Sequence, residues 1–263
     1  MLNNISMIEE RWIWLSSSVA LAVLAAWIRW FISRPTDDAP NWLLRWQRWW
    51  GRPWIEELTR LAFMVGIPAV ALLWRGVLTE RGLGFQPLLW PQSSATVAAR
   101  QVNWQNWVTD IGWTLGVVTV TGLILGLGTY QQRRLRHHKV KAHHELGTAL
   151  REAIHYESHW AFYREPFVLL WGPQIGSWMG LLPALIEALL NPQLWDDLQT
   201  FERGRNVLVR TGTGVMSALV FVNTQNIWCA LAADILLSYA MGTVVPHSDL
   251  LGAHAHNVKA AQA

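Results

Sequence analysis

The feature that most constrains the fold is a series of long apolar segments that carry few charged residues. Residues 12–32 and 107–130 are the clearest of them. Each is long enough to cross a bilayer as a helix, because a hydrocarbon core of about 30 Å needs roughly 20 helical residues. Hydrophobic residues make up 52% of the chain and charged residues 15%, which argues against a water-soluble protein. The sequence therefore predicts an all-α, polytopic transmembrane helical bundle.

Other apolar segments bring the predicted number of spans to six or seven. The four further segments are residues 61–77, 167–190, 207–222 and 227–245. A seventh span is added if the amphipathic helix predicted at residues 146–164 also crosses the membrane. Residues 42–60 interleave tryptophan and arginine, which is typical of a helix lying in the membrane interface. Residues 78–105 and 196–205 are polar and are predicted to form loops.

These segments divide the chain into three parts. An N-terminal membrane region covers residues 1–145, a helical core covers 146–246, and a polar tail covers 247–263. Glu9 and Glu10 precede the first apolar segment, which lacks an obvious small-residue cleavage site. We therefore expect a retained anchor rather than a signal peptide.

Tryptophan and the basic residues both point to a membrane surface. Many of the 19 tryptophans stand at the ends of apolar segments, where an indole ring with one polar N–H suits the headgroup boundary. Basic residues cluster in the arginine-rich loop after the first predicted helix and at 131–144, and two predicted spans separate these clusters. Both clusters then lie on one side of the membrane, which the positive-inside rule makes the cytoplasm, with the N-terminus outside.

The same clusters indicate the partners. In a membrane protein, basic clusters report topology and contact with anionic lipids. We expect membrane lipids and other membrane proteins as partners, and no nucleic acid. The expected location is a bacterial inner membrane.

Ionisable residues inside the apolar segments are the candidates for function. A charged side chain at bilayer depth costs at least ~2.5–3.5 kcal/mol, so it needs a partner or a functional role. The residues concerned are Asp110, Glu152, His155, Glu157, His159, Arg164, Glu187, Arg210 and Asp234. Asp110 and Arg210 lie near predicted helix ends, from which they could reach water.

Two interpretations of the histidines stay open. His155 and His159 are four residues apart and share a helical face, which suits one metal ion. Glu157 does not directly follow the first histidine, so the H-E-x-x-H motif is absent. A weak metal or general-base site with Glu187 or Asp234 is one interpretation. The other, which we favour, is a structural network in which Glu157 pairs with the arginine seven residues later.

No cofactor can be assigned from the sequence, and the chain is compatible with having none. Its single cysteine, Cys229, excludes an intrachain disulfide and a cluster of metal-bound thiolates.

Two strings in the helical core carry a family resemblance. Residues 223–234 read Asn-Thr-Gln-Asn-Ile-Trp-Cys-Ala-Leu-Ala-Ala-Asp, and residues 159–164 read His-Trp-Ala-Phe-Tyr-Arg. They resemble motifs of the CAAX-prenyl-protease and bacteriocin-processing (CPBP) family of intramembrane proteases, over roughly residues 157–239. The family's last core helix carries a histidine followed four residues later by an asparagine; Asp234 and Ser238 stand here instead.

The family's other motifs are also altered. Its first motif is a glutamate pair followed by an aromatic residue and an arginine; Arg164 and the aromatic are kept, and both glutamates are replaced. Its second motif, an aromatic residue followed four later by histidine, corresponds to Glu187 and Asn191. The resemblance implies a helical scaffold in which a glutamate activates water while histidines and asparagine stabilise an oxyanion. This chain lacks the glutamate pair that would raise one carboxyl pKa.

Three functions follow as expectations. The first is a divergent, catalytically inactive relative that acts as a binding or accessory protein, and the altered motifs favour it. The second is an active intramembrane peptidase with a rearranged site. Its candidate catalytic residues are Glu157, His159, Arg164, Glu187 and Asp234. The third is a structural subunit of a respiratory or photosynthetic membrane complex.

Overall fold

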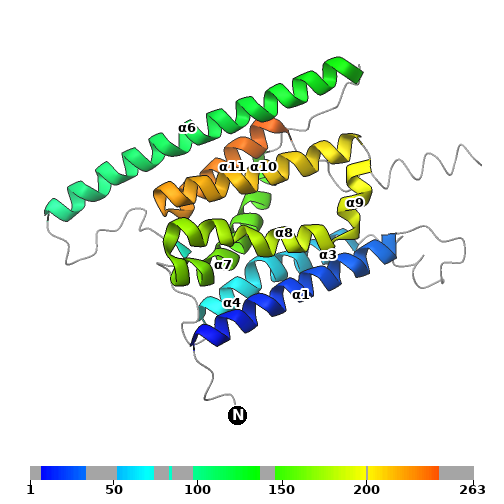
Figure 1. Ribbon diagram of the computed structural model, residues 1–263, viewed down its shortest axis with the longest axis horizontal. Helices are drawn as coiled ribbons and strands as arrows, with labels where there is room; N and C mark the ends of the chain where they lie inside the picture. The colour runs from blue at the N-terminus through cyan, green and yellow to red at the C-terminus, as the bar shows by residue number, and fades with distance from the viewer. Residues whose placement is uncertain are drawn as a thin grey trace, which may run out of the picture.

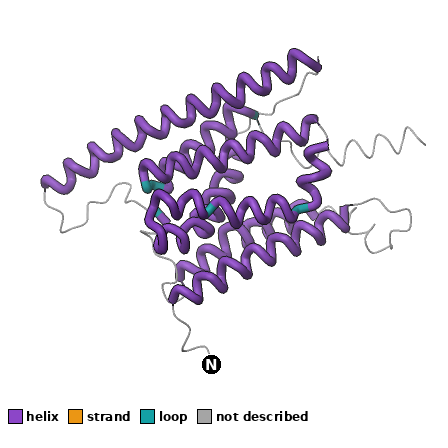
Figure 2. Tube along the Cα trace, in the orientation of Figure 1, coloured by secondary structure: helices purple, strands orange, loops and turns teal. Residues whose placement is uncertain are grey.

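The computed structural model describes residues 7–33, 52–73, 83–84, 97–136, 146–199 and 201–242. All regular structure within these residues is helical, which confirms the predicted class for this part of the chain (Figure 2). In chain order the elements are α1 (Met7–Ser33), α3 (Arg52–Leu61), the π-helix η2 (Ala62–Gly66), α4 (Ile67–Leu73), α6 (Val97–Arg136), α7 (Leu146–Met179), α8 (Leu181–Leu190), α9 (Pro192–Gln199), α10 (Phe201–Thr224) and α11 (Ile227–Met241).

Three helices in the described part are long and apolar enough to cross a membrane. They are Ile8–Ile32 in α1, Asn106–Gln131 in α6 and Arg203–Thr224 in α10. Each coincides with a predicted span. The other apolar helices, α8 and α11, are shorter. The structure therefore supports a membrane protein, and the total of six or seven spans stays a prediction.

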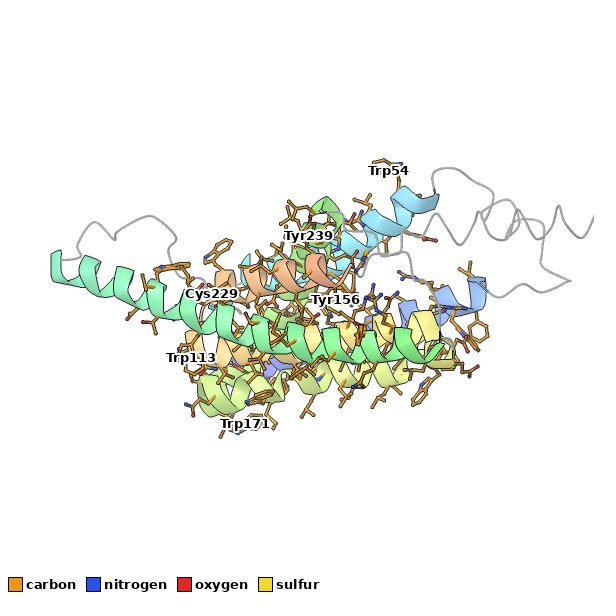
Figure 3. The ribbon with its side chains drawn as sticks, turned by 90° about the horizontal axis from the view of Figure 1, so that it is seen from above. Trp54, Trp113, Tyr156, Trp171, Cys229 and Tyr239 are labelled. Atoms are coloured by element: carbon orange, nitrogen blue, oxygen red, sulfur yellow. The ribbon has the colours of Figure 1, made fainter. Side chains whose placement is uncertain are left out.

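The helices form one bundle around α7. In Figure 1, α6 lies along one side and packs against α10 and α11, whereas α1 lies on the opposite side against α7, α8 and α9. Helix α6 runs antiparallel to α10, because Gly212 lies against Leu125 while Asn226, just beyond the far end of α10, meets Asp110. Exposed tryptophans such as Trp54 project from the outside of the bundle (Figure 3).

One end of the bundle gathers the C-termini of α1 and α6 and the N-termini of α3 and α10 (Figure 1). Two contacts mark this end: Trp30 donates its indole N–H to Asp196 at 2.8 Å, and Arg205 donates to the carbonyl of Met241 at 2.8 Å. The C-termini of α1 and α6 are where the two predicted basic clusters begin. The described parts of those clusters therefore lie at the same end of the molecule.

The predicted span at residues 167–190 is wrong as a single helix. Gly172 has φ 77° and ψ 170°, outside the helical region, so α7 is sharply kinked there. Glycine adopts this positive φ without the steric cost that a Cβ would bring. The chain then turns back on itself, and α8 packs against α7 instead of extending it.

Two glycines allow this reversal. A Cβ on Gly176 would lie 2.4 Å from the Cα of Val168, and one on Gly180 would lie 2.6 Å from the Cα of Arg164. These backbones therefore touch directly, an approach that small residues permit in membrane helices. The reversal places α8 beside the polar middle of α7.

Two predicted loops are helical where the structure describes them. Residues 97–105 form the start of α6, residues 196–199 belong to the end of α9, and residues 201–205 form the start of α10. Polar residues on the exposed side of a helix resemble a loop in composition, which explains both errors. Residues 42–51, 137–145 and 247–263, parts of the predicted interfacial helix, basic loop and tail, lie outside the described residues.

The segment predicted as the second span, 61–77, is helical as far as Leu73 and is continuous with α3. The π-helix η2 lies one turn before Pro68. A proline lacks an N–H and its ring clashes with the carbonyl four residues earlier, so the local widening is expected there.

Candidate functional site: a buried polar core on α7

The structure brings His159 and Glu187 together. We call Ser18, His159, Tyr163 and Glu187 the histidine cluster. His159 Nε2 lies 3.4 Å from both carboxylate oxygens of Glu187, and the Tyr163 hydroxyl donates a short hydrogen bond to the same carboxylate. The Ser18 hydroxyl lies 3.4 Å from that of Tyr163. The cluster thus joins α1, α7 and α8 through their side chains.

A second group, the arginine cluster, consists of Glu157, Arg164, Ser217 and Asp234. Arg164 Nη2 lies 4.0 Å from Glu157 Oε2, and these side chains are 3% and 2% exposed. The guanidinium also stands 3.6 Å from the ring centre of Phe221, a cation–π contact. The Glu157–Arg164 pair is the one that the structural interpretation of the sequence expected.

Asp234 completes the arginine cluster from α11. It accepts a hydrogen bond of 2.9 Å from Ser238, its neighbour one turn later. Its carboxyl group also interacts electrostatically with that of Glu157. Two acidic groups therefore lie near one another in the interior of the bundle, and Arg164 pairs with one of them, Glu157.

The arginine cluster is incompletely hydrogen-bonded. Among the described residues, both carboxylate oxygens of Glu157, Nε and Nη2 of Arg164, and the Ser217 hydroxyl are buried with no hydrogen bond of regular geometry from protein groups, although Ser217 and Glu157 interact. A cavity of about 10 Å³ lies beside Arg164 and Ser217 and is lined also by Ser177 and Gly180. A space of this size matches one water molecule.

The described residues give the metal interpretation no support. His155 and His159 are both buried. Nε2 of His159 faces Glu187 rather than the other histidine. Within the described residues, no group of three or more His, Cys, Asp or Glu side chains is placed to hold a metal ion.

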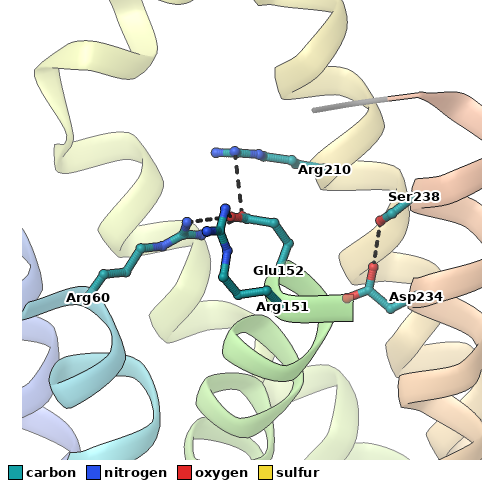
Figure 4. A network of polar contacts seen from close by, with 6 residues as sticks. All are labelled: Arg60, Arg151, Glu152, Arg210, Asp234 and Ser238. Carbon is teal, nitrogen blue, oxygen red and sulfur yellow. Dashed lines mark hydrogen bonds and ion pairs between the residues drawn. The ribbon is translucent and has the colours of Figure 1, made fainter. Parts of the chain in front are cut away.

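A third group surrounds Glu152 and is shown in Figure 4. Arg60 donates from both terminal nitrogens to the two carboxylate oxygens of Glu152, at 2.6 Å for Nη2. Arg151 and Arg210 lie 3.8 Å and 4.0 Å from the same carboxylate. We call these four residues the Glu152 network.

Helix α7, which carries Glu152, is not one of the three helices long and apolar enough to cross the membrane. Burial alone would raise the pKa of Glu152. The hydrogen bonds and charge of Arg60, with the charges of Arg210 and Arg151, outweigh burial and hold this pKa below its ordinary value.

Other polar residues differ from expectation. Asp110, expected within reach of water, is buried and accepts a hydrogen bond of 3.5 Å from Asn226. The sequence did not suggest a functional role for three residues of these clusters: Arg60, Ser18 and Ser217. Ser18 could have been found, because it lies in a run of serines inside an apolar segment. Tyr163 could also have been found, because it follows His159 by one helical turn and shares its face.

The turn before α11, which carries the family resemblance, is a helix cap. Asn226 accepts a hydrogen bond of 3.0 Å from the backbone N–H of Trp228, and its own N–H donates to the Thr224 hydroxyl at 3.2 Å. Gln225 between them has φ 51°, in the left-handed region. Capping by asparagine satisfies an N–H that the first helical turn leaves unpaired.

Comparisons with family models, with curated proteins and with solved structures find no match to this chain. Function is therefore inferred from the residues and from the geometry of the buried polar core.

Proposed function

We propose that this chain is an integral membrane protein with a CPBP-like helical core that does not hydrolyse peptides and acts as a binding or accessory protein. The observation that carries this proposal is the engagement of the acidic side chains. Glu187 is held by Tyr163 and His159, and Glu157 is 1% exposed beside Arg164. A general base needs a carboxylate that reaches both water and the substrate. Here Glu187 joins α8 to α7, and Glu157 is buried beside an arginine of its own helix.

The space beside the polar core supports the same conclusion. Hydrolysis of a peptide requires a cleft that admits an extended chain, with the scissile carbonyl within hydrogen-bond distance of the base. The cavity next to Arg164 measures about 10 Å³, which leaves room for a water molecule and none for a peptide.

A peptidase assay tests this proposal directly. The purified full chain is reconstituted in lipid vesicles and incubated with fluorogenic transmembrane and prenylated peptides. We expect no cleavage above that of empty vesicles. Cleavage by the wild type that is abolished by Glu157→Gln or Glu187→Gln would overturn the proposal. Thermal unfolding of the same two variants shows whether each is folded.

A second candidate function is a hydrolase with a rearranged site, which the contact between His159 and Glu187 favours. A carboxylate that orients a histidine is a recurrent way of preparing a general base. In that case Glu187→Gln would abolish activity and leave substrate binding unchanged. Peptidase activity of the wild type that Glu187→Gln abolishes would favour the hydrolase. No activity in the wild type would favour the binding or accessory protein.

The accessory role needs a surface that a membrane partner can reach. A groove of about 950 Å³ runs between α6 and α10 and is lined by apolar side chains, threonines and the glycines Gly112, Gly116 and Gly212. None of the described residues that line it is charged, and a Cβ on Gly112 or Gly116 would meet nothing within 4 Å. We propose one transmembrane helix of a partner protein as the occupant, since small residues permit close helix packing.

Filling the groove tests this assignment. Val120 lines it, whereas Leu123 on the same helix lies outside it and is similarly exposed. We expect Val120→Trp to reduce the size of the complex extracted from native membranes in mild detergent, and Leu123→Trp to leave it unchanged. An identical complex size for both variants would remove the groove as the partner's binding site.

A further inference from the structure

Two buried carboxyl groups lie near one another where α11 packs on α7. Glu157 on α7 is 1% exposed and Asp234 on α11 is 2% exposed. Of the charged groups that act on Asp234, Glu157 acts most strongly. A negative charge in the interior needs a cation or hydrogen-bond donors to offset the water that it has lost. The cations within reach of this pair therefore decide its charge state.

Arg164 compensates only one of the two carboxyl groups. Its Nη2 lies 4.0 Å from Glu157 Oε2, and its guanidinium stands over the ring of Phe221. Arg164 is not among the described charged groups that act on Asp234. One buried cation thus accompanies two buried carboxyl groups, and it pairs with Glu157.

The other groups around Asp234 do not supply a second buried cation. Helices α6, α7 and α10 pack against α11. Glu152 on α7 and Arg210 on α10 act on Asp234 with opposite sign, and the effect of Arg210 is the smallest. The side chain of Arg210 is 61% exposed and lies 4.0 Å from Glu152, so water and salt screen its charge.

The remaining charged groups next to α11 face its two ends. Asp110 on α6 meets Asn226, which is eight residues or about 12 Å along a helix from Asp234. Arg205 on α10 donates to the carbonyl of Met241, at the other end of α11. Within the described residues, neither of them acts on Asp234.

The oxygens of Asp234 show where a proton fits. Oδ1 accepts a hydrogen bond of 2.9 Å from Ser238 (Figure 4). Oδ2 is buried and has no hydrogen bond to the described protein groups. An ionised carboxylate would leave a charged oxygen there without a donor. A protonated carboxyl group is neutral, carries its O–H on Oδ2 and still accepts from Ser238 through Oδ1.

We propose that the arginine cluster is a proton-binding site, in which Asp234 carries a proton on Oδ2 and Glu157 stays ionised beside Arg164. With the proton bound, the cluster contains one cation and one anion. Without it, a second negative charge is buried near Glu157, so α7 and α11 repel one another at this point. The site goes beyond the accessory function proposed above and does not depend on it.

A bound proton makes stability depend on pH in a defined direction. In the unfolded chain Asp234 is solvated and ionises near pH 3.9, the ordinary value of about 3.9 for an aspartate. The folded protein keeps the proton to higher pH, so above that value it binds one proton more than the unfolded chain. The folding equilibrium constant should therefore fall about tenfold per pH unit, until the folded protein also releases its proton.

Unfolding of the full-length purified chain in mild detergent tests the proposal. Tryptophan fluorescence measures the folding constants of the wild type and of Asp234→Asn from about pH 4.5 to about pH 6.5. Asparagine has the shape and neutrality of the protonated carboxyl group and cannot ionise. We expect the ratio of the two constants, wild type over variant, to fall about tenfold per pH unit. A ratio that is constant or rises with pH would overturn the proposal.

Asp196→Asn is the matched control. Asp196 on α9 is partly exposed and accepts a hydrogen bond of 2.8 Å from Trp30. The ratio of wild type to this variant should not fall as the pH rises. An equal fall for both variants would mean that the pH dependence does not come from Asp234, which rejects the site.

Glu157→Gln tests whether the two carboxyl groups form one site. It removes the neighbouring negative charge and leaves Arg164 without its partner, so Asp234 should ionise more readily. In the Glu157→Gln background, the effect of Asp234→Asn should change less with pH than it does in the wild type. An unchanged pH dependence would show that Glu157 has no part in holding the proton.

Infrared spectroscopy keeps the proposal testable if Asp234→Asn fails to fold. At about pH 6, above the ordinary aspartate pKa, the wild type should show the C=O stretching band of a protonated carboxyl group. Ser238 donates to Oδ1, so Ser238→Ala should move this band to higher frequency. The absence of the band, or a band that Ser238→Ala does not move, would overturn the proposal.

Discussion

The histidine cluster and the arginine cluster lie within one short stretch of α7 but satisfy their polar groups differently. In the histidine cluster, the Glu187 carboxylate accepts a hydrogen bond from Tyr163 and faces His159. In the arginine cluster, Glu157 has a 4.0 Å contact with Arg164 and an interaction with Ser217, and neither of its oxygens accepts a hydrogen bond of regular geometry from described protein groups. The hydrogen bond of Glu187 joins α8 to α7. The buried charge of Glu157, in contrast, is compensated mainly by Arg164.

This difference predicts which substitutions destabilise the core most. Removing one member of a buried charge pair leaves the other desolvated and uncompensated, which costs more than the pair contributes when intact. Removing one hydrogen bond from a network with several members leaves the remaining groups partly satisfied. The arginine cluster should therefore respond sharply to loss of its one cation and weakly to loss of its hydroxyl.

The largest effect is expected for Arg164→Met. It leaves Glu157 in the interior without the guanidinium, so the free energy of unfolding should fall by about 3–5 kcal/mol. Unfolding of the detergent-solubilised protein, followed by tryptophan fluorescence, measures this. The double variant with Glu157→Gln should recover part of the loss. If the double variant is as unstable as the single one, the two residues are not coupled.

Gly176→Ala should have the next largest effect. Its Cβ would lie 2.4 Å from the backbone of Val168, so the reversal after Gly172 would have to open and the contact of α8 with α7 would be lost. We expect destabilisation of about 3 kcal/mol, at the upper end of overpacking costs. Gly147→Ala, at an exposed helical position where a Cβ meets nothing within 4 Å, is the control and should not destabilise the protein.

The reversal of α7 also shows what the sequence could and could not predict. Helices α1, α6 and α10 follow from apolar segments of bilayer length, which is a local property. The 167–190 segment has the same composition, yet it folds back because Gly176 and Gly180 find backbone partners eight and sixteen residues earlier. The sequence shows that these glycines are present, but not that they pack against the backbone of α7.

The contact between His159 and Glu187 exists only because the chain reverses and brings α8 beside α7. The sequence named His159 as a candidate and offered two acidic partners on facing helices. The packing of α8 on α7 decides that Glu187 meets the histidine, and the packing of α11 on α7 decides that Asp234 interacts with Glu157. Arg60 escaped notice because Glu152 is 92 residues away, and no local pattern connects them.

Tyr163→Phe tests the histidine cluster. It removes the hydroxyl that donates to Glu187 and lies near Ser18, and it keeps the ring that fills the core. We expect a loss of about 1.5–2 kcal/mol in unfolding free energy, in the lower part of the range for a hydrogen bond to a charged group. Ser18→Ala, which removes only the weaker 3.4 Å contact, should cost less. Equal losses would show that the bond to Glu187 contributes little.

Ser217→Ala should have the smallest effect and completes the contrast. The Ser217 hydroxyl interacts with Glu157 without a hydrogen bond of regular geometry, and it borders the cavity beside Arg164. Removing it loses only this weak contact, so the expected change is about 0.5 kcal/mol, at the low end for a hydrogen bond. Chemical unfolding of this variant and of Tyr163→Phe under identical conditions makes the comparison. A loss for Ser217→Ala as large as that for Tyr163→Phe would mean that the hydroxyl is bonded after all. The arginine cluster would then be as fully satisfied as its neighbour.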